Sequence, residues 1–142
     1  MGVDSGKART GLPRRPRGHN DHLVLGALTR AGKPLGAYEL LGQLREAGLR
    51  SPLQIYRALD RLIAAGSVHK IASLSAYTAC SDAACGRHCH AVFAVCTRCG
   101  QATEMHAPSL AGLLVRVARA QRFQMETTTV ELSGLCESCV HA

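Results

Sequence analysis

The chain has 142 residues, of which 46% are hydrophobic and 19% charged, and its 17 Lys and Arg residues exceed its 10 Asp and Glu residues to give a net charge of +7. This composition is typical of a globular protein, and no hydrophobic run reaches the roughly 18 residues that a membrane-spanning helix needs. The basic excess favours an anionic partner, most often nucleic acid.

Residues 1–18 are predicted to be a flexible basic arm, because their cationic side chains are interrupted by Gly and Pro and show no hydrophobic periodicity. A first helix is predicted from a cap at Asn20 or Asp21 to a stop at Gly32. A second helix is predicted from Tyr38 to Ala47, where hydrophobic residues recur every three positions.

The third helix is predicted over residues 51–66, because Ser51-Pro52 is a strong helix start and Gly66 a helix end. Loose alternation over residues 68–79 then predicts two short strands around a turn near residues 73–75. Three helices followed by a hairpin indicate a winged helix-turn-helix. The polar side chains of its third helix are candidates for DNA contacts: Gln54, Tyr56, Arg57 and Arg61.

After Cys80 the pattern changes to α+β. Strands are predicted at residues 90–95, 101–105 and 125–132, with a helix at residues 108–122 between the last two. The fold class is therefore α+β, with a basic arm (1–18), a winged-helix domain (19–80) and a second, metal-binding domain (81–142).

The strongest chemical signal is a pair of Cys-x-x-Cys motifs, one at Cys96 and Cys99 and one at Cys136 and Cys139. Each motif can bind one metal ion through two thiolates, and four thiolates suit a closed tetrahedral structural zinc site. An odd total of seven cysteines excludes complete internal disulfide pairing. We find no export signal and expect a cytoplasmic, reducing location, in which such a chain binds metal.

A second, dispersed group of potential ligands comes from both halves of the chain. One thiolate, one or two imidazoles and a carboxylate would form a mixed site that holds zinc less permanently than four thiolates, as a sensor requires. The residues are His69, Cys80, His88, Cys89, His90, Glu104 and His106.

Enzymatic function is not expected, because the sequence lacks the motifs of zinc deaminases, zinc proteases, serine hydrolases and phosphate-binding loops.

Several segments resemble the ferric uptake regulator family, and most closely its zinc uptake regulator branch. The resemblance runs from about residue 20 to residue 139. It rests on the third helix and wing (residues 55–62 and 66–71), on Tyr77 with Cys80, on Ala91-Val92-Phe93, and on the two Cys-x-x-Cys motifs with their neighbouring glycines.

The resemblance implies a homodimeric repressor with an N-terminal winged helix and a C-terminal α+β dimerisation domain. It implies structural zinc at the four cysteines and a regulatory zinc bound by His69, Cys80, Glu104 and a fourth ligand. Counted from Cys80, that ligand is His88, whereas counted back from Cys96 it is Cys89. His90 is also within reach, and we prefer His88, then His90.

Cys80 favours zinc over the harder iron and manganese ions, so the expected function is zinc-responsive repression of zinc-uptake genes, with zinc as co-repressor. An iron- or manganese-responsive regulator of the same family and a zinc-stapled protein-binding adaptor are the alternatives. A metal bound by both His69 and Glu104 would bridge the two domains and fix the spacing of the two DNA-reading helices in a dimer.

Overall fold

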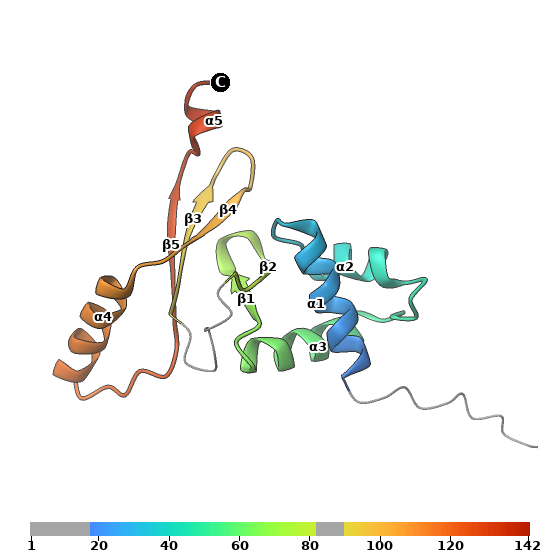
Figure 1. Cartoon of the computed structure of the whole chain (residues 1–142), viewed down its shortest axis with the longest axis horizontal. Coiled ribbons are helices and arrows are strands. Elements are labelled where there is room, and N and C mark those ends of the chain that lie inside the picture. Colours follow the sequence, from blue (N-terminus) through green and yellow to red (C-terminus); the bar gives the residue numbers. More distant parts are fainter. Residues whose placement is uncertain (1–17, 82–89) are drawn as a thin grey trace, which may run out of the picture.

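Three helices and a hairpin form the N-terminal half of the computed structural model, which describes residues 18–81 and 90–142 (Figure 1). They are α1 (His19–Ala31), α2 (Ala37–Leu44), α3 (Pro52–Ala64), β1 (Val68–Ile71) and β2 (Ala76–Ala79). The predicted winged helix-turn-helix is confirmed. Helix α1 begins slightly earlier than predicted, after Gly18 in the left-handed region (φ 88°), and α2 ends at Leu44 rather than Ala47.

Helix α3 starts where local sequence places it. The Ser51 hydroxyl accepts a hydrogen bond from the Gln54 N–H, and the Gln54 side-chain oxygen accepts one from the Ser51 N–H, which closes a capping box. Pro52 occupies the first helical turn, where its missing N–H has no cost. These contacts fix the start of the helix that carries the candidate DNA-binding residues.

One hydrophobic core holds the three helices and the hairpin together. Its buried members come from each element and include Leu28, Leu40, Leu59, Val68 and Tyr77. An isolated bridge between Leu35 and Tyr77 attaches the loop before α2 to the hairpin, with N···O distances of 2.8 and 2.9 Å. The helices and the wing therefore form one packed unit.

The C-terminal half is a three-stranded sheet with two helices. Its elements are β3 (His90–Cys96), β4 (Ala102–Met105), α4 (Pro108–Ala120), β5 (Thr128–Gly134) and α5 (Glu137–Val140). The strand order is β4-β3-β5, with β4 antiparallel and β5 parallel to β3. The α+β class is confirmed, but β5 lies two to three residues later than predicted, and α5 was not predicted.

The wing belongs to both halves of the fold. Val68 and Tyr77 pack into the helical core, whereas Ile71 is buried in a second core with Ala91, Phe93 and Val95. Leu74, in the turn of the hairpin, packs against this second core as well. The sheet of the second half is thereby held against the wing.

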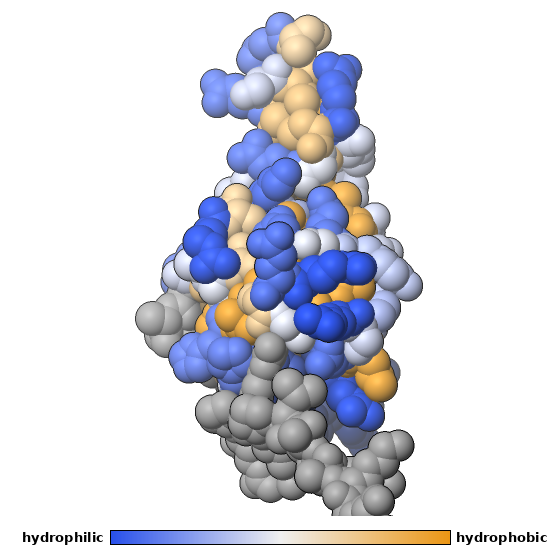
Figure 2. Space-filling view, turned by 90° about the vertical axis from the view of Figure 1, so that its right-hand side faces the viewer, coloured by the Kyte–Doolittle hydropathy of each residue, from blue (hydrophilic) through white to orange (hydrophobic). Residues whose placement is uncertain are grey.

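Helix α4 lies apart from the rest of the described chain (Figure 1). None of its residues is buried, although hydrophobic side chains recur along it, and Leu113 and Val117 are 47% and 55% exposed. Viewed from the helical end, the surface is mostly hydrophilic, with small hydrophobic areas (Figure 2). No helix in the described part of the chain is long and hydrophobic enough to cross a membrane.

Candidate metal centres

The two Cys-x-x-Cys motifs meet because β3 and β5 run parallel. Cys96, the last residue of β3, lies in register with Gly134, the last residue of β5. Parallel strands end at the same edge of a sheet, so the turn after β3 and the turn after β5 emerge side by side. The first turn carries Cys99, and the second leads through Cys136 into α5, which carries Cys139.

Hydrogen bonds join the two turns directly, independently of any metal ion. The Thr97 N–H donates to the Gly134 carbonyl at 2.8 Å, and the Thr97 hydroxyl donates to the same oxygen at 3.2 Å. The Arg98 guanidinium donates to the Cys139 carbonyl. Gly100, in the left-handed region at φ 74°, closes the first turn by donating to the Cys96 carbonyl. This network positions the four thiols.

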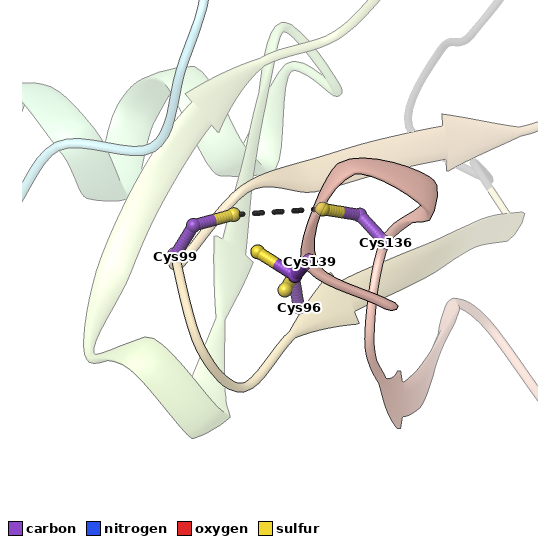
Figure 3. Close-up of side chains that lie close together, drawn as sticks. All are labelled: Cys96, Cys99, Cys136 and Cys139. Atoms are coloured by element: carbon purple, nitrogen blue, oxygen red, sulfur yellow. Dashed lines mark hydrogen bonds between the residues drawn. The ribbon is translucent and has the colours of Figure 1, made fainter. Parts of the chain in front are cut away.

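The four sulfurs point toward one another and lie within 4.8 Å of each other (Figure 3). The Sγ atoms of Cys99 and Cys136 are 3.8 Å apart, and none of the four cysteines forms a disulfide. Four thiolates about 2.3 Å from a zinc ion have tetrahedral sulfur–sulfur separations of about 3.8 Å. The Cys99–Cys136 separation matches this value and all four sulfurs lie within 4.8 Å of one another, so the group suits a zinc ion.

Contacts within the group shift the pKa values of two of the four thiols, in opposite directions. Hydrogen bonds from the backbone N–H groups of Cys99 and Cys136 lower the pKa of the Cys96 thiol. By contrast, a hydrogen bond with the Cys136 side chain, together with burial, raises the pKa of the Cys139 thiol. Four closely packed thiolates repel one another, so full ionisation of the cluster needs a cation among them.

A second group joins the wing to the sheet. It consists of His69 on β1, Cys80 directly after β2, and Glu104 on β4, and the ligand atoms lie within 4.8 Å of one another. His69 Nε2 lies 3.9 Å from Glu104 Oε1, and the Cys80 thiol lies 3.9 Å from the same oxygen. This set of nitrogen, sulfur and oxygen donors suits zinc.

The surroundings of this group keep His69 in the form that binds metal and orient Glu104. Burial lowers the pKa of His69, and this outweighs the opposite effect of the Glu104 charge, so the imidazole is kept neutral, as a metal ligand must be. Phe93 packs against the His69 ring at 5.6 Å. The backbone N–H and hydroxyl of Ser81 donate to Glu104 Oε2 at 3.0 and 2.8 Å, which orients the carboxylate.

Of the predicted regulatory ligands, His69, Cys80 and Glu104 come together. His88 and Cys89 lie outside the described residues. His90 begins β3 and is not among the residues of the group, and its Nδ1 atom is buried without a hydrogen-bond partner in the described part of the chain. His106 is exposed and lies outside the group.

The four candidate DNA-binding residues of α3 differ in their surroundings. Tyr56 and Arg57 are exposed, and within residues 18–81 and 90–142 the Arg57 guanidinium has no ion pair or hydrogen bond. Gln54 uses its side-chain oxygen in the capping box, and the Arg61 guanidinium binds both carboxylate oxygens of Asp21 on α1, at 2.7 to 3.1 Å. Arg57 is therefore the cation on α3 most available to a partner.

Sequence reasoning missed three supporting residues: Ser81, Arg98 and Asp21. Each acts through a contact between residues 23 to 41 positions apart in the chain, which no local motif marks. Only Arg98 had a signal, because it lies inside a Cys-x-x-Cys motif.

Comparison with known proteins gives a consistent result. The model of the ferric uptake regulator family matches residues 25–133. The chain is 35% identical over 118 residues to the zinc uptake regulation protein of Escherichia coli (strain K12), a match that covers 82% of this chain and 68% of the relative.

Two solved structures are similar throughout. Holo XcZur is 40% identical, with a TM-score of 0.78 over 87% of this chain and 86% of that one. A zinc uptake regulator in complex with zinc and DNA is 31% identical, with a TM-score of 0.79 over 87% of this chain and 82% of that one.

Proposed function

Because the chain belongs to the ferric uptake regulator family, we propose that it is a zinc-responsive, DNA-binding transcriptional repressor of zinc-uptake genes, with zinc as co-repressor. The observation that carries the proposal is the group of His69, Cys80 and Glu104, which places ligands from the wing and from the sheet within 4.8 Å of one another. The likeness to a zinc uptake regulator in complex with zinc and DNA supports it. A cytoplasmic location, where the chromosome is accessible, follows from this function.

We propose two zinc ions per chain with different roles. Cys96, Cys99, Cys136 and Cys139 hold a structural ion, because four soft ligands and the hydrogen bonds between their turns form a closed site. His69, Cys80 and Glu104 hold the regulatory ion with a further ligand, for which His88 and then His90 are our choices. A zinc ion held there would cross-link the wing to the sheet, with Cys80 binding as a thiolate after loss of its proton.

The chain's own residues convert that cross-link into DNA binding. The wing is continuous with α3, and Ile71 packs against the sheet, so the position of the wing sets the orientation of α3 relative to the second half of the chain. In a dimer, this orientation sets the distance between the two copies of α3, which must match successive major grooves. Because this coupling is reciprocal, operator DNA tightens zinc binding.

A homodimer is part of the proposal. The edge strand β5 and helix α4 expose Leu132, Leu113 and Val117, and an open hollow of about 350 Å³ over β3 and β5 is lined in part by Leu132 and Leu135. Within the described residues, α4 buries none of its own side chains. A second copy of this surface would cover these hydrophobic groups.

The proposed function is tested by titrating DNA binding with metal. Duplexes selected from a random pool at saturating zinc serve as the operator, and affinity is measured at buffered free zinc, iron(II) and manganese(II). We expect zinc to raise operator affinity by about 5- to 150-fold, the usual range of allosteric coupling. A response to iron or manganese alone would favour the other regulators of this family, and a flat dependence on salt would favour a protein-binding adaptor.

Arg57 is expected to contribute directly to the DNA interface, because it is exposed on α3 beside Tyr56 and has no acceptor in the described chain. Arg57→Ala should weaken operator binding by about 1–3 kcal/mol if the side chain reads a base, or reduce the salt slope by about 1 if it binds a phosphate. Fluorescence anisotropy across a salt series distinguishes the two results.

Arg30→Ala on α1 is the matched control, since it removes the same charge outside α3. Equal affinities and equal slopes for the two variants would exclude Arg57 from the interface.

A further inference from the structure

Glu131, which belongs to neither group of candidate metal ligands, makes a second polar contact between the sheet and the wing. It lies in the middle of β5, and its carboxylate accepts hydrogen bonds from the N–H groups of Ala72, at 2.6 Å, and Ser73, at 3.2 Å. A hydrogen bond with the Ser73 side chain is the main reason that the pKa of Glu131 is lowered, followed by those two N–H groups. The contact therefore favours the ionised carboxylate.

The contact lies at the start of the turn that joins the two strands of the wing. Ala72–Leu74 form a 3-10 turn between β1 and β2, and the first N–H groups of such a turn have no acceptor within it. Glu131 supplies that acceptor from a strand nearly sixty residues further along the chain. A carboxylate bound by two N–H groups and a hydroxyl is a charge-assisted contact, which is stronger and more directional than a neutral one.

The two polar contacts attach opposite ends of the wing. Cys80 and Ser81, at the base of the hairpin, reach Glu104 on β4, whereas the turn at the other end reaches Glu131 on β5. The packing of Ile71 and Leu74 against the sheet is hydrophobic and non-directional, so with a single polar attachment it restricts rotation of the wing only weakly. Two directional polar attachments at different ends restrict this rotation further, and with it the freedom of α3 to change its orientation.

We propose that Glu131 is a positioning residue that fastens the wing turn to β5 and thereby lowers the free zinc concentration at which the chain becomes competent to bind DNA. This deepens the proposed function and depends on it. The contact holds the wing in the conformation in which His69 and Cys80 face Glu104. Without it, that conformation is a smaller fraction of the apo protein, and apparent zinc affinity falls by the same factor.

The test compares the full-length zinc-loaded dimer with its Glu131→Gln variant. The variant keeps the size of the side chain but loses its charge. We expect the free zinc needed for half-maximal operator binding to rise by about 3- to 10-fold, while the dimer mass and the four-cysteine zinc stay unchanged. The control is Glu46→Gln, which makes the same charge change at an exposed position after α2.

A second variant removes the donor instead of the acceptor. Ala72→Pro deletes one N–H at the first position of the 3-10 turn, where proline is tolerated, and the preceding Ile71 is extended (φ −100°, ψ 102°), as a residue before proline prefers. We expect it to shift the zinc midpoint in the same direction. The double variant should be no worse than the stronger single variant, because both remove one contact.

A DNA-free measurement separates failure of this inference from failure of the proposed function. In zinc-loaded protein, amide hydrogen exchange at Ala72 and Ser73 should be faster in Glu131→Gln than in Glu46→Gln. Unchanged exchange, a zinc midpoint equal to that of Glu46→Gln, or additive effects in the double variant would each overturn the role of Glu131. If the unmodified protein itself showed no zinc-dependent DNA binding, that result would instead overturn the proposed repressor function.

Discussion

Replacing Cys136 with serine is expected to remove one zinc ion per chain, abolish the dimer and sharply reduce soluble yield. The residue lies at the junction of β5 and α5, and its sulfur is 3.8 Å from that of Cys99. Structural zinc sites of this type contribute apparent binding energies of about 10–16 kcal/mol, which is comparable to the whole stability of a domain, about 5–15 kcal/mol. Losing the ion therefore releases α5 and the end of β5.

The measurements are zinc content per chain, mass in solution and thermal unfolding. Ser138→Ala is the control, because it alters α5 between Cys136 and Cys139 without removing a ligand, and it should leave all three unchanged. If Cys136→Ser remained a folded dimer with a normal zinc response, the four-cysteine site would not be structural, and the division of roles between the two sites would fail.

Replacing Cys80 with serine is expected to have the opposite profile. The variant should keep its dimer and its structural zinc, because Cys80 contributes to neither the four-cysteine group nor the hydrophobic cores. It should lose the second zinc, or bind it far more weakly, since a hydroxyl replaces the thiolate that favours zinc. Zinc-dependent operator binding should be lost with it.

Operator affinity at buffered free zinc tests this expectation beside the metal count. His69→Gln should behave like Cys80→Ser, whereas His106→Gln should not, because His106 is exposed and lies outside the ligand group. Persistent zinc-dependent binding by Cys80→Ser would show that Cys80 is a packing residue and that sensing occurs elsewhere.

Local sequence predicted the helical half well because its determinants are local. Ser51, Pro52 and Gln54 carry the start of α3 within four residues, and the hydrophobic spacing of the helix identifies its buried face. The grouping of the four cysteines was also predictable, since the Cys-x-x-Cys spacing within each motif is itself typical of a metal site. His69, Cys80 and Glu104 belonged to a wider set of dispersed candidate ligands that only the resemblance narrowed, and the structure brings these three together.

The remaining features depend on pairing between distant segments. Nothing near β5 shows that it pairs parallel to β3, and that register decides which residues meet at the edge of the sheet. Helix α5 has four residues, too few to show a period. In the sequence, Arg61 and Arg57 are both arginines on the polar side of α3, and nothing local distinguishes them. Only the packing of α1 against α3 places Asp21 beside Arg61.

The parallel pairing of β3 with β5 also has a consequence for synthesis. Cys136 follows Cys99 by 37 residues, so at about 5–20 residues per second the ribosome exposes the first cysteine pair about 2–7 s before the second. During that interval, Cys96 and Cys99 form an open dithiol at the end of an incomplete sheet. On the proposed structural role, four thiolates can surround a zinc ion only once β5 has paired with β3, so zinc insertion would have to wait for the synthesis of β5 and α5. A cell short of zinc at that moment would accumulate newly made chains whose cysteine pairs hold no metal and stay open to oxidation.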